Sequence, residues 1–210
     1  DCARLSAAGN DIVFHPDEGQ IYPEPQVFSV EPPAVAGKLE GRFRPGHFRG
    51  VATVVLKLFN IVQADRAYFG QKDYQQQTLI RVMTRELDLP TEIMTCETIR
   101  DPDGLALSSR NAYLSPAERQ SGLSLSRALR QAQQSVAQGE RDLERIQSAM
   151  RREIEQTPGI KLDYAVVVHH GSLTPLSVAE PVMVALVAAR VGTTRLIDNM
   201  ILRRPSNTNS

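Results

Sequence analysis

The chain has 210 residues, 41% of them hydrophobic and 23% charged, and its formal net charge at pH 7 is +0. This length allows one large domain or two smaller ones, and the balanced charge gives no reason to expect a nucleic acid or a membrane as partner. No apolar run approaches the roughly 18 residues of a membrane helix. Cys2 and Cys96 show no pairing or metal-ligand spacing, and the first residues do not resemble a signal peptide, so we expect a cytoplasmic protein.

The first fifty residues predict little regular structure. Asp11–Phe14 is a short apolar segment after a Gly9-Asn10 turn, and it predicts a strand. Residues 22–33 are rich in proline. Because proline interrupts helices and interior strands, this segment predicts a loop. Residues 38–49 then hold four cations and a single acid. Such a cluster is either a solvated surface or an anion site.

The next segment predicts a helix and then a strand–helix–strand unit. Apolar residues recur at helical spacing from Val51 to Val62. A short buried strand is expected at Arg66–Phe69, a helix over residues 73–87 and a second strand at Glu92–Glu97. Two strands joined by one helix pair in parallel. Ligands of such sheets bind outside the carboxyl ends of the strands, which is where Gly70–Asp73 and the segment after Glu97 fall.

The second half of the chain has a different pattern. A capping box with proline at the first helical position, Ser115–Glu118, predicts a helix that ends near Gly139. A second helix with one apolar face is expected over residues 143–154. Alternating apolar residues from Ile160 to Val168 predict a strand with one buried face. Two further strands are expected at residues 181–190, which are apolar on both faces, and from residue 194.

The predicted fold class is therefore α/β. Residues 1–112 are expected to form a Rossmann-like nucleotide-binding domain with a parallel sheet, incomplete at its N-terminus because the sequence begins as if in mid-fold. Residues 113–202 are expected to form a smaller α+β domain with an antiparallel sheet. The boundary falls just before Ser115, in the loop that carries Ser108–Arg110, and we expect the tail, residues 203–210, to be disordered.

The most informative stretch is Phe69–Gln76. Gly70 lets the backbone approach a ligand closely, and the amides at the start of the following helix favour anions. Lys72 adds a mobile charge suited to phosphate, Asp73 either caps the helix or binds ribose hydroxyls, and Gln76 lies one helical turn beyond Lys72. The alternative is an ordinary strand-to-helix turn with solvated side chains. The spacing is not that of a P-loop.

A second polar stretch is Leu107–Asn111. Ser108 and Ser109 offer two hydroxyl donors, and Arg110 can hold phosphate oxygens through paired hydrogen bonds. Gly104 and the domain junction provide hinge positions, so this loop is expected to move; the alternative is an ordinary linker between domains.

The histidines give weaker indications. His47, between glycines and cations, is either a general base or a structural histidine. The pair His169-His170 has no carboxylate or cysteine at metal-ligand spacing, so we expect no metal there.

Five segments of the chain also occur in a recognisable order. They are Leu39–Gly41, Arg44–Val51, Phe69–Gln76, Asp103–Asn111 and Arg195–Asn199. Together they resemble the successive signatures of the pantothenate synthetase family, and the resemblance runs from about Asp11 to Leu202. The second, third and fourth segments are highly specific in combination.

The resemblance implies an ATP-dependent ligase that joins pantoate to β-alanine on the route to coenzyme A. The pantoate carboxylate attacks the α-phosphorus of ATP and gives pantoyl adenylate and pyrophosphate. The β-alanine amine then attacks the acyl carbon and releases AMP. Because a carboxylate is a poor nucleophile towards a polyanion, catalysis must depend on positioning and charge neutralisation. The resemblance also implies Mg²⁺ as a partner of the pyrophosphate, without a protein cage, and a homodimer.

The resemblance further assigns roles to residues. Gln76 would bind pantoate, Gly70 and Asp73 would hold the ribose, and Ile99 and Leu107 would flank the adenine. The catalytic residues, which would also grip the phosphates, are Lys72, Ser108, Ser109 and Arg110. The complete ATP-binding set is Gly70, Gln71, Lys72, Asp73, Ile99, Leu107, Ser108, Ser109 and Arg110.

The sequence departs from the family in one respect. The family begins with a strand, a loop with two histidines in an HxGH-type pattern and a helix, and this pattern and one of the pantoate glutamines are absent from the printed sequence. We therefore expect either a fragment of a longer protein or a chain that cannot catalyse the first step alone. Two other hypotheses stay open, namely a non-catalytic nucleotide-binding or dimerising module and an adenylyltransferase acting on another acid.

Overall fold

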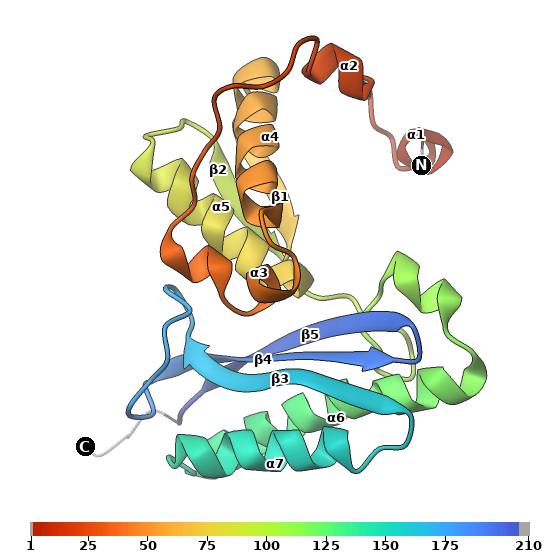
Figure 1. The fold of residues 1–210 in the computed structure, drawn as a ribbon, viewed down its shortest axis with the longest axis vertical. Helices are drawn as coiled ribbons and strands as arrows, with labels where there is room; N and C mark the ends of the chain where they lie inside the picture. The colour runs from red at the N-terminus through yellow and green to blue at the C-terminus, as the bar shows by residue number, and fades with distance from the viewer. Residues whose placement is uncertain (1, 206–210) are drawn as a thin grey trace.

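The computed structural model describes residues 2–205, and its strands form two sheets (Figure 1). A parallel sheet pairs β1 (Arg66–Gly70) with β2 (Glu92–Cys96). An antiparallel sheet has the order β3 (Ile160–His169), β4 (Val182–Val191) and β5 (Thr194–Arg203). The predicted α/β architecture, with a parallel sheet before an antiparallel one, is confirmed.

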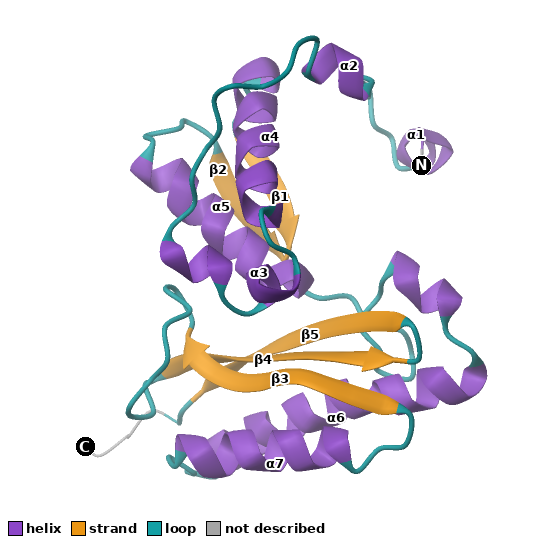
Figure 2. Cartoon of the chain, viewed as in Figure 1, coloured by secondary structure: helices purple, strands orange, loops and turns teal. Residues whose placement is uncertain are grey.

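Helices flank the parallel sheet in the first half of the chain (Figure 2). The predicted helices are confirmed as α4 (His47–Val62) and α5 (Tyr74–Glu86). The predicted strands are confirmed as β1 and β2, but the expectation that β1 is buried is wrong, since Tyr68 is 65% exposed. A sheet only two strands wide leaves much of each strand uncovered. The shorter helical elements are α1 (Cys2–Ala7), α2 (Glu18–Ile21), η1 (Ala34–Gly37), α3 (Glu40–Phe43), η2 (Gln71–Asp73) and η3 (Ser109–Tyr113).

The strand predicted at Asp11–Phe14 does not form. This segment has no ladder partner among the described residues, and Ile12 is 87% exposed. An apolar segment needs a neighbouring strand to satisfy its backbone polar groups as a sheet, so local sequence alone was insufficient. The proline-rich loop after it is confirmed as largely irregular.

In the second half, α6 (Pro116–Ala137) and α7 (Leu143–Glu155) cover one face of the antiparallel sheet (Figure 2). The capping box is confirmed, because the Ser115 backbone amide donates to the Glu118 carboxylate at 2.8 Å and the Glu118 amide donates to the Ser115 hydroxyl at 3.3 Å. The main core lies between these helices and the sheet. Its largest fully buried members are Leu125, Leu129, Ile146, Met150, Ile154, Met183 and Leu202.

A bulge in β3 changes which face its apolar residues cover. The register with β4 shifts between Leu162 and Tyr164, which leaves Asp163 as the additional residue. Ile160 and Leu162 therefore pack towards the helices, whereas Tyr164 packs on the opposite face. The prediction that these alternating residues share one buried face is wrong, because an extra residue reverses the alternation.

The two halves of the molecule meet at the face of the antiparallel sheet that the helices do not cover (Figure 1). Tyr164 of β3 and Leu186 of β4 pack there with Tyr74 of α5 and Leu39, which precedes α3. The Tyr74 hydroxyl also donates to the His170 carbonyl at 2.9 Å. These contacts place η2 and the start of α5 against the sheet.

Regular structure at the C-terminal end extends further than predicted. Arg203 is the last residue of β5, and the Arg204 amide donates to the Pro181 carbonyl at 3.0 Å. The rest of the predicted tail, residues 206–210, lies outside the described residues. Across residues 2–205 no helix combines the length and the apolar character that crossing a membrane requires.

Candidate active site

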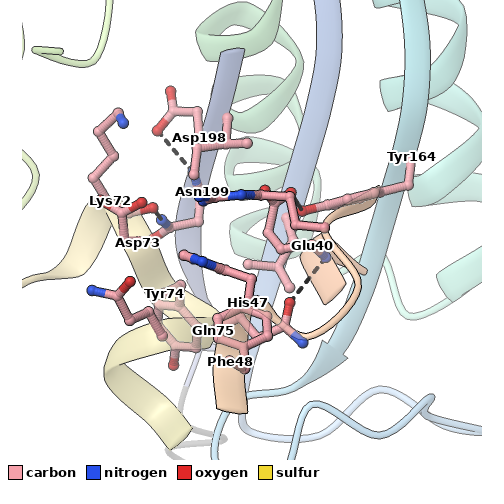
Figure 3. A pocket seen from close by; sticks show the side chains of 14 residues that line it. Glu40, His47, Phe48, Lys72, Asp73, Tyr74, Gln75, Tyr164, Asp198 and Asn199 are labelled. Carbon is pink, nitrogen blue, oxygen red and sulfur yellow. Dashed lines mark hydrogen bonds between the residues drawn. The ribbon is translucent and has the colours of Figure 1, made fainter. Parts of the chain in front are cut away.

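A cleft lies between the two halves, where η2 and α5 face β3 and β5 (Figure 3). Its volume is about 420 Å³ including the open mouth. Side chains from three regions line it, and most of them are polar or charged. They include Glu40, Arg44 and His47 near α3 and α4, Lys72, Asp73 and Gln76 near η2 and α5, and Tyr164, Asp198 and Asn199 on the antiparallel sheet.

Lys72 also lines a small adjoining cavity, and residues of both predicted polar stretches meet there. Ser108, Arg110 and Asn111 line it from the other side. The Asn111 side-chain amide donates to the Ala106 carbonyl at 3.1 Å, and its buried oxygen has no hydrogen-bond partner among the described residues. A buried acceptor without a partner costs free energy.

The other residues predicted to bind the nucleotide lie near these cavities with mixed exposure. Ser109 begins η3 and is exposed, and it lines neither cavity. Ile99 and Leu107 are 70% and 52% exposed. The Leu107 amide donates to the Ile99 carbonyl at 2.8 Å, so these two apolar side chains come from neighbouring backbone segments.

The turn at Asp101–Gly104, which contains the predicted hinge position Gly104, is tied to α6. Arg119 contacts the carboxylates of Asp101 and Asp103, each at 2.7 Å. Gly104 has a φ of 99°, a conformation that glycine adopts without strain. In this structure the turn is therefore held against the helix.

The turn from β1 into α5 is held in place by its backbone. The Asn199 side-chain amide donates to the carbonyls of Gln71 and Lys72, each at 2.9 Å, and its oxygen accepts from the Gln71 side chain at 3.3 Å. Asp73 makes no side-chain capping bond and is exposed, so its carboxylate is available to a ligand. At Gly70 an added Cβ would meet no atom within 4 Å, so the protein's own packing does not require glycine there.

The three successive glutamines face different surroundings. Gln77 is buried and donates to the Thr95 hydroxyl. Gln75 is buried as well, donates to two carbonyls of the 35–38 segment, each at 3.0 Å, and accepts from the Glu40 amide at 3.0 Å. Gln76 is the one of the three that is only partly buried, and it lines the cleft on the same side as Lys72.

A network centred on Arg195 joins the two halves beside the cleft. Arg195 donates to both carboxylate oxygens of Glu40, at 2.5 and 2.9 Å, and to Asp163 at 2.6 Å. The Tyr164 hydroxyl donates to Glu40 at 2.7 Å, and the guanidinium lies 4.7 Å from the centre of the Phe43 ring. The bulge in β3 provides Asp163, and the side chains of Arg195, Glu40 and Asp163 are only 14%, 13% and 6% exposed.

This network perturbs the titration of its members. Burial alone would raise the pKa of Glu40, but hydrogen bonds from Arg195 and Tyr164 outweigh it and hold that pKa below its usual value. Burial, with the adjacent Glu40 charge, raises the pKa of Tyr164. Burial would lower the pKa of Arg195, but hydrogen bonds to Glu40 and Asp163 raise it. Glu40 is therefore ionised and fully engaged at neutral pH.

Asp198 is engaged in the same way on the other side of the cleft. Arg100 donates to its two carboxylate oxygens at 2.6 and 2.9 Å, and its side chain is only 3% exposed. Asp198 also accepts from the Asn199 backbone amide at 2.8 Å. This ion pair connects the loop before Ser108 with β5.

Sequence reasoning assigned no individual role to Glu40, Arg195, Asp198 or Asn199, although three of them lie in one short segment, Arg195–Asn199. The available signal was a predicted strand that contains Arg, Asp and Asn beside apolar residues, because buried charges are normally paired. The adjacent His169 and His170 lead into a turn, in which His169 accepts from the amides of Gly171 and Ser172 at 3.0 Å each.

Comparison with known proteins gives one consistent result. A family model described as pantoate-β-alanine ligase matches residues 1–201. The pantothenate synthetase of Koribacter versatilis (strain Ellin345) is 46% identical over 207 residues, which cover 99% of this chain and 71% of that protein. The crystal structure of pantothenate synthetase from Thermus thermophilus has a TM-score of 0.90 at 42% identity, over 95% of this chain and 72% of that one. A pantoate-β-alanine ligase from Francisella tularensis, solved with β-γ ATP and β-alanine, has a TM-score of 0.73 at 34% identity, over 96% of this chain and 68% of that one.

Proposed function

We infer that this chain, which belongs to the pantoate–β-alanine ligase family, condenses pantoate with β-alanine in an ATP-dependent reaction that gives pantothenate, AMP and pyrophosphate. In the first step the pantoate carboxylate attacks the α-phosphorus of ATP and displaces pyrophosphate. In the second step the β-alanine amine attacks the acyl carbon of pantoyl adenylate and displaces AMP. Neither step needs a covalent bond to the protein, so catalysis depends on orientation and charge.

The convergence of Lys72, Ser108 and Arg110 around one cavity is the observation that carries this proposal. Lys72 supplies a point charge and Arg110 a planar fork, and the two suit phosphate oxygens in different ways. Ser109 begins the same η3 turn and is the fourth residue that we propose for catalysis.

The remaining binding roles follow from position. Gln76 lines the cleft one helical turn beyond Lys72, which supports it as a ligand of pantoate. The exposed carboxylate of Asp73 and the open backbone at Gly70 and Gln71 support a ribose site. The exposed side chains of Ile99 and Leu107 support an apolar site for the adenine.

Mg²⁺ is proposed as a partner of the phosphates. Glu40 and Asp198 are already bound to arginines, which leaves Asp73 as a carboxylate of the cleft that is open to solvent. This donor set fits a cation that keeps most of its waters and is bound mainly by phosphate oxygens. When bound, the ion would neutralise part of the charge on ATP and pyrophosphate.

Three broader features are also proposed. The division into residues 1–112 and 113–202 is supported by the separate sheets on either side of η3. A cytoplasmic location is supported by two exposed, unpaired cysteines.

A homodimer is supported by exposed apolar side chains on α4 and β1, where Ile61, Val62 and Tyr68 are 50%, 51% and 65% exposed. Sedimentation at several protein concentrations tests the dimer, and a monomer at every concentration would refute it.

The test of the proposed function is a product balance, measured on the intact protein. With pantoate, β-alanine and ATP, we expect equal amounts of pantothenate, AMP and pyrophosphate. Without β-alanine, pyrophosphate release should stop near one equivalent per site, because the adenylate stays bound. Binding of ATP without any pyrophosphate release, with each acid tried, would identify a binding module instead. Faster release with another acid than with pantoate would identify a different adenylyltransferase.

A further inference from the structure

The second chemical step has two requirements that the phosphate-binding residues do not meet, if the proposed function holds. The amine of an amino acid is protonated at neutral pH, as a lysine side chain is, and only the neutral amine can attack an acyl carbon. Its carboxylate, at the far end, must also be held so that the nitrogen reaches that carbon. A neutral base and an unoccupied cation, both in the cleft, would satisfy these requirements.

His47 has the properties of such a base. It is the first residue of α4 and lines the cleft with Lys72 (Figure 3). Gln76 lines the same cleft, and the His47 ring has no hydrogen-bond partner among the described residues. Burial and the neighbouring Arg44 hold the pKa of His47 below its usual 6.5, so the ring is neutral at pH 7. The charged or titratable groups that face it are Glu40, Arg44, Asp73, Arg110, Lys72, Tyr164 and Asp198.

Arg44 has the properties of the cation. It is exposed, lines the same cleft, and also lines the adjoining open cavity with Arg110. Within residues 2–205 its guanidinium has no ion pair and no side-chain hydrogen bond, whereas Arg195 and Arg100 are fully engaged by carboxylates. The nearby Glu40 is already bound to Arg195 and Tyr164. Arg44 therefore remains available to a carboxylate from solution.

These groups line one cleft, so a single bound substrate can contact several of them. Lys72 and Gln76 lie on the cleft wall that we assign to the phosphate and the acid. His47 lines the cleft from the start of α4, and Arg44 precedes it by three residues on the approach to that helix. A short amino acid with its carboxylate at Arg44 would therefore lie in the cleft that His47 also lines.

We propose that Arg44 and His47 form the subsite for the amino acid, in which Arg44 binds its carboxylate and His47 removes a proton from its ammonium group. The neutral amine then attacks the acyl carbon, so that a C–N bond forms. The acyl C–O bond to the phosphate breaks, and its electron pair leaves with AMP. The second proton of the amine nitrogen goes to the departing phosphate oxygen, and His47 passes the first proton to solvent.

The test uses preformed pantoyl adenylate, so that it does not depend on the first step. The full chain is mixed with the adenylate and β-alanine, and AMP release is followed in a single turnover. In His47→Gln the rate should fall on the order of 100-fold or more, as expected for a lost general base. Hydroxylamine, whose nitrogen is already neutral at pH 7, should restore most of that rate. The acid limb of the pH profile, expected below pH 6.5 in the unmodified protein, should disappear in His47→Gln.

The carboxylate contact is tested with a second amine. Arg44→Ala should raise the KM for β-alanine by about 10- to 100-fold, the range for a lost charged hydrogen bond. Propylamine, which has a methyl group where β-alanine has its carboxylate, should react equally well with the variant and the unmodified protein. Arg42→Ala and His15→Gln, which change exposed residues outside the cleft, serve as matched controls.

Several results would overturn the proposal. One is a His47→Gln rate with β-alanine that stays within a few-fold of the unmodified protein's rate. Another is a fall in the His47→Gln rate with hydroxylamine as large as the fall with β-alanine, which would mean that His47 has a structural role. A third is an unchanged preference of Arg44→Ala for β-alanine over propylamine. Failure of the unmodified chain to accelerate aminolysis of the adenylate would also refute it. In contrast, the absence of a pyrophosphate burst from ATP and pantoate would count against the proposed function and leave the aminolysis result valid.

Discussion

Replacing Arg195 with methionine would remove the group that connects α3 with the antiparallel sheet. The guanidinium makes a paired contact with Glu40 and a third contact with Asp163. Methionine fills a similar volume and keeps the packing against Phe43, but it leaves two carboxylates without their partner. Removing one partner of a buried ion pair costs about 3–5 kcal/mol. Because Arg195 is 14% exposed and Glu40 keeps the Tyr164 hydroxyl, we expect the lower end, about 3 kcal/mol.

The measurement is urea unfolding followed by circular dichroism, since the chain has no tryptophan. Arg195→Lys keeps the charge and loses the planar guanidinium, so its free energy of unfolding should lie between those of the unmodified protein and Arg195→Met. Arg66→Ala is the matched surface control, because its ion pair with Glu92 is 61% exposed on both sides. That variant should unfold almost as the unmodified protein does.

The loss of stability caused by Arg195→Met should also depend on pH in a defined direction. The pKa of Glu40 is lower in the folded protein than its ordinary 4.5. Its ionised form therefore stabilises the fold above about pH 4.5, and this contribution disappears as the pH falls from 4.5 through the folded pKa. The free-energy difference between the unmodified protein and Arg195→Met should shrink over the same range. A difference no larger than that of Arg66→Ala, or one that grows in acid, would refute the assignment of this network as a buried link.

Two further changes test local parts of the same region by thermal or urea unfolding. Gly41→Ala should destabilise the protein by about 2 kcal/mol or more, because the new Cβ would lie 1.6 Å from the Ala36 carbonyl oxygen. Gly50→Ala, in α4 with no atom within 4 Å of the new Cβ, should instead be neutral or stabilising, and equal effects of the two would contradict this reason. Tyr164→Phe should cost about 1 kcal/mol, because Glu40 loses one donor and keeps Arg195; a loss as large as that of Arg195→Met would mean that the hydroxyl has another role.

Local signals in the sequence predicted elements whose cause is also local. The capping box at Ser115 and the helical spacing of Leu143, Ile146, Met150 and Ile154 define α6 and α7 correctly. The turn at Gly70 correctly separates β1 from α5. In each case the residues that form the element also contain the information about where it begins or ends.

Features that depend on distant residues were not predicted. Glu40 and Arg195 are 155 positions apart, and nothing near either residue identifies the other. The bulge at Asp163 is visible only as a register shift against β4. The strand expected at Asp11–Phe14 did not form, because its apolar pattern had no neighbouring strand among the described residues.

The candidate site shows the same division. Lys72, Ser108 and Arg110 were selected from two short polar stretches, and the fold brings them to one cavity. Gln75 and Gln77 could not be distinguished from Gln76 by sequence except through helical spacing. Their burial depends on a turn and a strand that lie elsewhere in the chain.

The most direct test of the central claim is the pyrophosphate burst of Lys72→Ala with ATP and pantoate, measured in the intact protein. Lys72 lines both the cleft and the adjoining cavity, so its loss should slow formation of the adenylate by about 100-fold or more while circular dichroism stays unchanged. Lys161→Ala, which removes an exposed lysine on β3, should keep a normal burst. A full burst at the normal rate from Lys72→Ala would contradict the account.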